Sequence, residues 1–216
     1  MEVQKHGFRW EKEMLHIFGA TEEEIKSIPY TCHVDLPAKY NRLGRYPLSI
    51  KTSSSKGTIC MADAIRLYDA VSSRNRLHLI LIRYKQKANK KIVSSIIEFD
   101  LTDSVKELFG ELTRSQLKHL DDTVKKVPQN RKPTVEEHAT MYSIKKELQL
   151  KSGAISLAIK CNSTQSRLQC AIPYKKYEAL IQNTERVIAS SQTHEFRGGY
   201  ISEEIESSKR VFKCKD

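Results

Sequence analysis

The sequence lacks the usual marks of several protein classes. Its five cysteines are an odd number without a CxxC pair, which argues against a disulfide framework or a zinc site. No apolar run approaches the ~18 residues of a membrane span, and the N-terminal segment MEVQKHGFRWEKEM has no signal-peptide core. We therefore expect an intracellular, cytoplasmic protein with no membrane partner.

Common catalytic motifs are missing as well. The sequence contains no GxxxxGK[ST], GxGxxG, HExxH or GxSxG, and its seven histidines show no paired spacing suited to a metal. These absences argue against a phosphate-loop nucleotidase, a dinucleotide-binding enzyme, a zinc peptidase of that motif and a nucleophile-elbow hydrolase.

Positive charge is in excess. Lysine and arginine total 37 against 26 aspartate and glutamate residues, so the formal net charge is +11. Such a balance favours a polyanionic partner, most often nucleic acid.

Hydrophobic periodicity predicts a mixed α/β or α+β fold, with a central mixed β-sheet flanked by helices. We expect one domain over residues 1–190, with a catalytic core at about 7–100 and a helical part with a recognition hairpin at about 101–190. Residues 191–216 read as a polar C-terminal arm. The expected helices are 8–18, 61–74, most of 102–148 and 174–190, and the expected strands are 30–36, 47–53, 77–84, 91–99, 154–160 and 167–172.

One acid and one lysine stand out on neighbouring predicted strands. Asp35 ends the first strand, Lys51 lies in the next, and on a hairpin the two side chains would meet. Phosphodiester hydrolysis needs carboxylates that hold Mg²⁺ and benefits from a cation near the attacking water. The same pair is also typical of a solvated sheet surface.

These residues resemble the PD-(D/E)XK nuclease superfamily, which contains the type II restriction endonucleases. The pattern is an Asp, a gap, and (D/E)-x-K on the next strand; VDLP supplies Asp35 and SIK supplies Lys51. The segments GFRWE, SIKT and ADAIR are similar to segments of restriction-type proteins of giant and chlorella viruses, which is consistent with a bacterial or viral origin. The resemblance spans residues 7–71 and, more loosely, 154–173, and it implies a restriction-endonuclease-like core.

The chain departs from the pattern at Ser49, where the family usually has an acid. A branch of restriction enzymes shares this Ser-x-Lys and takes its second acid from the following helix, so the resemblance implies Asp63 as a replacement. Asp63 reads equally well as a residue that favours a helix N-terminus. The resemblance also implies that Asp35, Asp63 and the Ile50 carbonyl ligate Mg²⁺. Lys51 would act on the water or the developing charge, and Glu11, in preference to Glu13, would support a second metal or hold Lys51.

A DNA partner suggests residues for recognition. Gln165, Arg167 and Gln169 alternate along a predicted hairpin, and Arg and Gln side chains bond bidentately to guanine and adenine edges. The polar side of a surface hairpin would look the same. Basic residues that flank the proposed site and would suit phosphates are Lys39, Arg42, Arg45 and Lys56.

The leading hypothesis is a Mg²⁺-dependent restriction-type endonuclease that acts on double-stranded DNA as a homodimer, because two nicks on antiparallel strands match a two-fold protein. Two alternatives stay open: a repair or structure-specific nuclease of the same superfamily, and a non-catalytic DNA-binding protein on a decayed nuclease fold. Ser49 is the feature that supports the second alternative.

Overall fold

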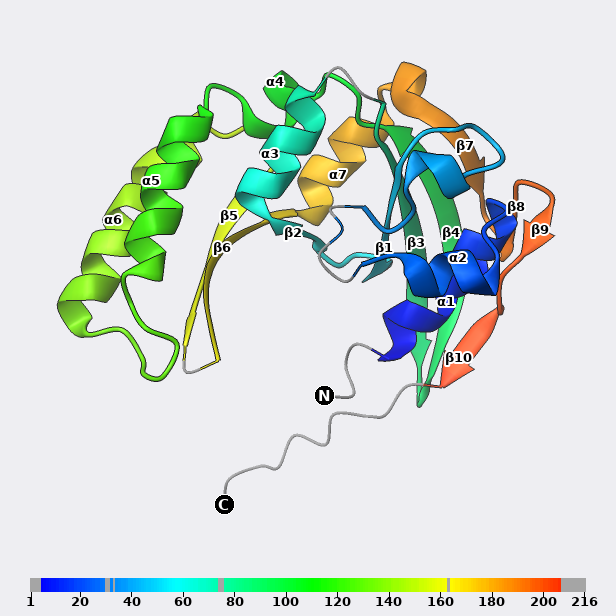
Figure 1. Cartoon of the computed structure of the whole chain (residues 1–216), viewed down its shortest axis with the longest axis horizontal. Helices are drawn as coiled ribbons and strands as arrows, with labels where there is room; N and C mark the ends of the chain where they lie inside the picture. Colours follow the sequence, from blue (N-terminus) through cyan, green and yellow to red (C-terminus); the bar gives the residue numbers. More distant parts are fainter. Residues whose placement is uncertain (1–4, 30–31, 33, 74–75, 163, 207–216) are drawn as a thin grey trace. The chain divides into compact units, whose positions relative to one another are not determined.

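A computed structural model describes residues 5–29, 32, 34–73, 76–162 and 164–206 (Figure 1). The chain forms two compact units, each built from separated segments. Unit 1 comprises residues 1–56, 78–100 and 187–216, and unit 2 comprises 57–77 and 101–186. The expected mixed α/β architecture with a central mixed sheet and flanking helices is confirmed.

Unit 1 is built on a five-stranded mixed sheet in which β1 pairs with β3, β3 with β4, and β4 with both β10 and β7. Among these pairs of described strands, β1–β3 is parallel and the others are antiparallel. The first six residues of β3 are all buried, as expected for a strand covered on both faces. The strands are β1 (Leu48–Ser54), β3 (His78–Lys87), β4 (Lys90–Asp100), β7 (Val187–Ser191) and β10 (Glu204–Glu206), and a small hairpin adds β8 (Glu195–Phe196) and β9 (Gly199–Tyr200).

Helix α1 (Lys5–Ile17) carries the main apolar contacts of this unit. Trp10, Met14 and Phe18 are fully buried and belong to one cluster with Leu48 and Ile50 of β1. Trp10 and Met14 lie on one face of α1, and Phe18, the first residue after the helix, continues this face because its amide bonds to the Met14 carbonyl at 3.1 Å. The helices that follow are α2 (Glu22–Ser27), which begins with a capping box at Thr21, and the 3₁₀ turn η2 (Ala38–Tyr40).

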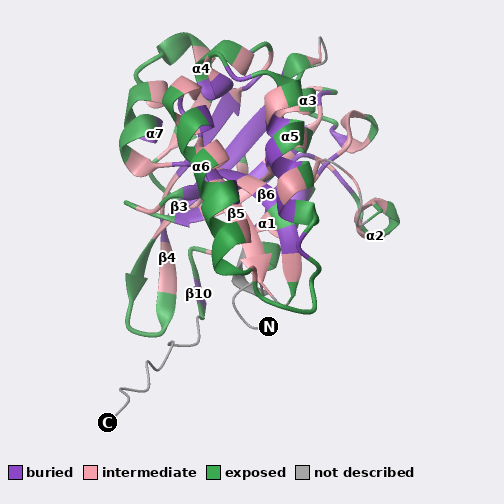
Figure 2. Cartoon of the chain, turned by 90° about the vertical axis from the view of Figure 1, so that its left-hand side faces the viewer, coloured by how far each residue is buried: buried purple, intermediate pink, exposed green. Residues whose placement is uncertain are grey.

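Unit 2 contains a three-stranded antiparallel sheet in the order β2–β6–β5. Helices α5 and α6 lie on one face of the β5–β6 hairpin (Figure 1), and the outward side of α6 is largely exposed (Figure 2). The elements are β2 (Ile59–Asp63), α3 (Ala64–Ser72), α4 (Val105–Phe109), α5 (Arg114–Lys125), α6 (Val135–Lys151), β5 (Ser156–Asn162), β6 (Gln165–Ile172), α7 (Tyr174–Ile181) and η3 (Thr184–Arg186).

Several sequence-based boundaries were wrong. Residues 61–63, expected to be helical, end strand β2, and the predicted helix 174–190 stops at Ile181 because residues 187–191 pair with β4. The expected polar arm is instead structured over 191–206, where β8, β9 and β10 form. Its remainder, 207–216, lies outside the described residues. The described part of the expected strand 30–36 contributes only a bridge at Leu36.

The expected split of the domain at about residue 100 also differs from the observed units. Residues 57–77 fall in unit 2 although they precede residue 100, and 187–190 fall in unit 1 although they follow it. None of the helices in the described part of the chain combines the length and apolarity needed to cross a bilayer.

Candidate active site

The site begins where the chain enters β1. Leu36 and Leu48 exchange two backbone hydrogen bonds of 3.1 and 2.9 Å, and the amide of Asp35 donates to the same Leu48 carbonyl at 2.9 Å. Both leucines are fully buried. This short antiparallel contact fixes Asp35 beside the first residues of β1, as the hairpin interpretation required.

The Asp35 carboxylate is held through one oxygen. Oδ2 accepts hydrogen bonds from the Ser49 hydroxyl at 3.2 Å, the Ile50 amide at 2.6 Å and the Lys51 ammonium at 2.9 Å. Among the described residues, every hydrogen bond to the Asp35 side chain ends on Oδ2. The carboxylate therefore has a defined orientation, and the expected meeting of Asp35 and Lys51 is found.

Lys51 makes a second contact of equal length. Its Nζ donates to the Ile50 carbonyl at 2.9 Å as well as to Asp35. The Lys51 and Asp35 side chains are 22% and 24% exposed, so the pair lies at the surface of the core and remains accessible to a ligand.

Glu11 joins the same cluster from α1. Its side chain is half-buried, and burial, together with the negative charge of Asp35, raises its pKa to about 7, although the positive charge of Lys51 opposes the rise. Glu13 has a different role, because its carboxylate accepts hydrogen bonds from the Ser202 amide at 2.7 Å and the Ser202 hydroxyl at 2.6 Å. The Glu13 carboxylate is thus engaged with Ser202, and the preference for Glu11 as the site residue stays a prediction.

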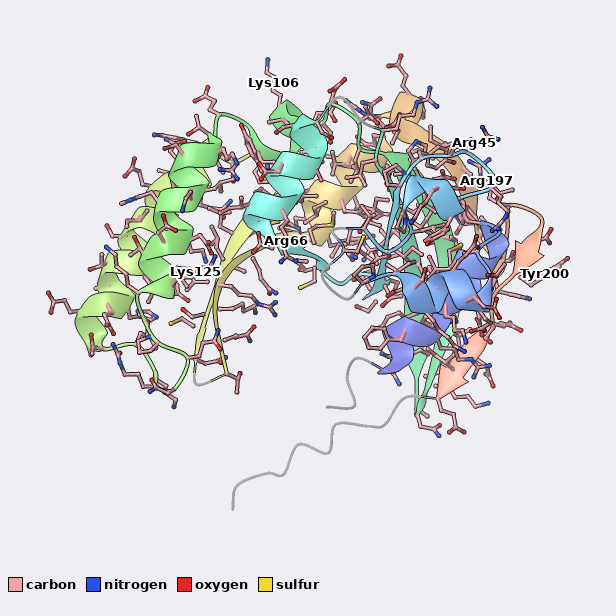
Figure 3. The ribbon with its side chains drawn as sticks, in the orientation of Figure 1. Arg45, Arg66, Lys106, Lys125, Arg197 and Tyr200 are labelled. Carbon is pink, nitrogen blue, oxygen red and sulfur yellow. The ribbon has the colours of Figure 1, made fainter. Side chains whose placement is uncertain are left out.

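Asp63 belongs to unit 2, whereas the cluster of Glu11, Asp35 and Lys51 belongs to unit 1. Its carboxylate caps α3 by accepting the Arg66 amide at 2.9 Å. The negative charge of Asp63 contributes to the raised pKa of Lys125, after the larger effect of Asp121. Lys125 is labelled on α5 in Figure 3. The proposal that Asp63 replaces the missing acid of Ser49 stays a prediction.

A β-bulge determines the register of Asp63. The ladder with β6 shifts by one residue between Cys60 and Ala62, and Ala62 has a φ of 75°, a value that L residues rarely adopt. Asp63 is consequently opposite Gln169. In an unshifted ladder it would be opposite Leu168, whose side chain is fully buried.

The predicted recognition residues share one strand face. Along β6 the even-numbered residues from Ser166 to Ile172 are buried, while Gln165, Arg167 and Gln169 are half-buried or exposed, which confirms the expected alternation. The Arg167 guanidinium donates to the Gln165 side-chain oxygen at 3.1 Å. Their role in reading DNA stays a prediction.

Helix α5 anchors this strand from its buried side. The Leu168 amide donates to Asp121 at 3.0 Å, and the Ser166 hydroxyl donates to the Val124 carbonyl at 2.6 Å. These bonds were not anticipated from the sequence, because Asp121 is 47 residues from Leu168 and lies in an ordinary amphipathic helix. They fix the two neighbours of Arg167 in place.

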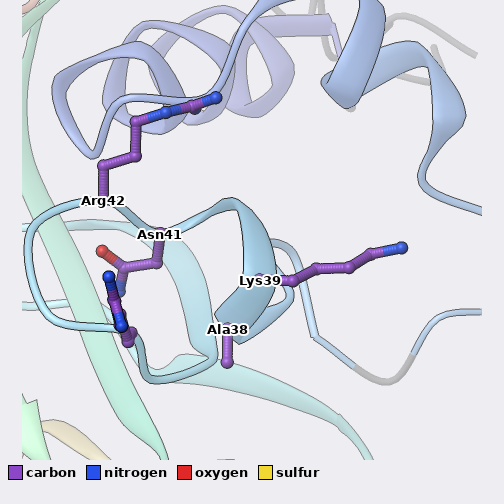
Figure 4. Close-up of a pocket in the computed structure, with 5 residues that line it drawn as sticks. Ala38, Lys39, Asn41 and Arg42 are labelled. Atoms are coloured by element: carbon purple, nitrogen blue, oxygen red, sulfur yellow. The ribbon is translucent and has the colours of Figure 1, made fainter.

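The basic residues near β1 differ in availability. Arg42 makes a bidentate ion pair with Glu24 at 2.8 Å for each contact, and this hydrogen bonding lowers the pKa of Glu24 to about 2. The Arg42 charge is therefore partly neutralised by Glu24. Arg45 and Lys56 are exposed. A cavity of about 630 Å³ is lined by Ala38, Lys39, Asn41, Arg42 and Arg45 (Figure 4).

A buried carboxylate that sequence reasoning missed supports unit 1. Glu98 is fully buried and accepts hydrogen bonds from the Tyr46 hydroxyl at 2.8 Å, His78 at 2.7 Å and the Arg197 guanidinium at 2.6 Å. Burial alone would raise the pKa of Glu98, but the hydrogen bonds outweigh burial and lower it. These four residues are dispersed in the sequence, so no local pattern marked them.

The donor atoms of the cluster suit a hard divalent cation. In the described part of the chain, no group of three or more His, Cys, Asp or Glu side chains is arranged to hold a metal. Mg²⁺, however, is usually held by one or two carboxylates with water and phosphate oxygens. The carboxylate of Asp35 and the carbonyl of Ile50, with Glu11 nearby, fit that requirement.

The raised pKa of Glu11 predicts a pH-dependent stability. Between the ordinary value of 4.5 and about 7, the native protein keeps a proton on Glu11 that the unfolded chain has lost, so stability decreases as the pH rises through this window. Glu11→Gln should therefore stabilise the metal-free protein at pH 8, by at most ~3 kcal/mol, and change little at pH 4. Urea denaturation in EDTA measures this effect. The control Glu23→Gln changes an exposed helix residue, and an equal effect of Glu11→Gln at both pH values would contradict the assignment.

Comparisons with known proteins do not assign the chain to a family. No family model matches it, and neither does any curated protein or solved structure. The function is therefore argued from the residues and geometry of the candidate site.

Proposed function

We propose that this protein is a Mg²⁺-dependent endodeoxyribonuclease of the type II restriction type, which hydrolyses phosphodiester bonds in double-stranded DNA at a short site. The observation that carries the proposal is the cluster in unit 1. Asp35, Lys51 and Glu11 come from three separate segments, and the Lys51 ammonium lies 2.9 Å from Asp35. This set matches the PD-(D/E)XK pattern at the acid and at the lysine.

The chemistry follows from the donor atoms. Asp35 and the Ile50 carbonyl would hold Mg²⁺, with Glu11 as a nearby carboxylate, and the bound ion would supply electrostatic stabilisation of the phosphoryl oxygens and a more acidic water. The Lys51 ammonium lies 2.9 Å from both the Asp35 carboxylate and the Ile50 carbonyl oxygen. From this position it can orient the attacking water or stabilise the charge that develops on the phosphoryl group. Hydrolysis forms a bond from the water oxygen to phosphorus and releases the leaving oxygen of the DNA backbone.

The surface chemistry supports DNA as the substrate. The net charge of +11, the exposed Arg45 and Lys56, and the exposed Arg167 on the hairpin suit a polyanion. We propose that Gln165, Arg167 and Gln169 contact base edges and that the other basic residues contact phosphates. A homodimer is part of the proposal, since a two-fold protein matches two antiparallel strands.

Ser49 favours one other candidate, a non-catalytic DNA-binding protein. Its hydroxyl donates to Asp35 at the position where an acid would add negative charge. An inactive protein would keep the fold and the basic surface and lose only metal-dependent cleavage. Incubation of plasmid DNA with the purified protein, with Mg²⁺ and with EDTA, separates the two candidates.

Lys51→Ala should abolish Mg²⁺-dependent plasmid cleavage, because the ammonium acts in the chemical step, and should retain the fold and DNA binding. The matched control is Lys12→Ala, which removes the same charge from an exposed ion pair between α1 and Glu22 of α2. Gel assays of cleavage and binding, with circular dichroism as a check of folding, give the result. Cutting by Lys51→Ala at the rate of Lys12→Ala would refute the role of Lys51.

Asp63→Asn should reduce cleavage about as much as Asp35→Asn if Asp63 supplies the second acid. An Asn side chain at an N-cap still accepts the Arg66 amide, so the helix start is preserved and the change tests charge alone. Cleavage rates of the two variants at several Mg²⁺ concentrations provide the comparison. An Asp63→Asn variant with the wild-type rate would leave Asp63 as a structural cap.

Arg167→Ala should weaken binding to the recognition site by ~1–3 kcal/mol and change binding to unrelated DNA much less, as expected for a lost base contact. Lys56→Ala serves as a control for a phosphate contact and should weaken both kinds of binding alike. Titrations with site-containing and site-free duplexes over a range of salt concentrations measure this difference. Equal losses on both duplexes would show that the hairpin does not select sequence.

A further inference from the structure

The Lys51 ammonium bridges two oxygen atoms of the candidate site. Its Nζ is 2.9 Å from Asp35 Oδ2 and 2.9 Å from the Ile50 carbonyl oxygen. One oxygen is a carboxylate and the other a peptide carbonyl, which are the oxygen types that hard divalent cations prefer. The Lys51 ammonium therefore lies between the two oxygen atoms, Asp35 Oδ2 and the Ile50 carbonyl oxygen, that would ligate the metal in the proposed function.

We propose that Lys51 occupies the position of the metal in the metal-free protein, so that a divalent cation must displace the ammonium before it can bind. This inference rests on the proposed metal site. A divalent ion held at about 2.0–2.1 Å by these two oxygens leaves no room for an ammonium at hydrogen-bond distance from both. The two cations also repel each other, so their occupancies exclude one another.

The remaining contacts of Asp35 allow this exchange. When Lys51 leaves, the Ser49 hydroxyl and the Ile50 amide still bond to Oδ2 and keep the carboxylate oriented. The lysine side chain is 22% exposed and flexible, and the nearby Glu11 carboxylate interacts with its charge. Ser49 thus orients Asp35 through a neutral donor that has no need to leave.

The exchange gives the displaced lysine a role in timing. While the ammonium bridges Asp35 and Ile50, it is not available to the attacking water or to the phosphate. Displacement by the metal releases it at the site of reaction. Metal binding and the positioning of Lys51 are therefore coupled, and Lys51 is predicted to weaken metal binding while it supports the chemical step.

Mn²⁺ binding to the protein without DNA, measured by electron paramagnetic resonance with Mg²⁺ as competitor, tests the inference independently of activity. Lys51→Met keeps most of the side-chain volume and should bind Mn²⁺ about tenfold more tightly than the wild type. A matched control, Lys12→Met, should stay within about twofold of the wild type, because it removes an equal charge from an exposed ion pair.

Asp35→Asn tests the metal site separately from the displacement of Lys51. Circular dichroism confirms that each variant is folded. If Asp35→Asn loses Mn²⁺ and Lys51→Met does not bind it more tightly than Lys12→Met, the metal site stands and the displacement is refuted. That result would indicate a metal on the other Asp35 oxygen. If neither the wild type nor Lys51→Met binds Mn²⁺, the metal-dependent function and this inference both fail.

Discussion

One carboxylate oxygen, Asp35 Oδ2, organises the candidate site. It receives donors from three consecutive residues of β1, namely the Ser49 hydroxyl, the Ile50 amide and the Lys51 ammonium. A carboxylate oxygen that accepts several donors is held in one orientation. The burial of Leu36 and Leu48 brings this oxygen to β1, so the apolar core determines where the charge lies.

Burial and the neighbouring charges explain the raised pKa of Glu11. Its side chain approaches from α1 into a half-buried place beside the negative charge of Asp35, and the positive charge of Lys51 opposes the rise. Burial and like charge both favour the neutral acid, which raises the pKa of Glu11.

Local patterns predicted much of unit 1 because its segments have strong periodicity. The buried run of β3 and the helical stripe of Trp10, Met14 and Phe18 can be read without tertiary information. The strands β7 and β10 could not be predicted in this way, since they form by pairing with β4, which lies 88–95 and 112–116 residues earlier in the chain. The same limit applies to Glu98, whose three partners lie 20, 52 and 99 residues away.

The two candidate acids differ in the same way: the position of Asp35 follows from nearby sequence, and that of Asp63 depends on tertiary structure. Asp35 and Lys51 were predictable because a short antiparallel contact between Leu36 and Leu48 brings them together. The position of Asp63 depends on a bulge that no residue preference predicts. Ala62 adopts a positive φ without being glycine, which costs free energy and persists only where the surroundings impose it. Here the ladder to β6 on one side and the cap of α3 on the other impose it. Asp63 is therefore tied to the strand that carries Gln165, Arg167 and Gln169, and any function of this acid is coupled to the geometry of that hairpin.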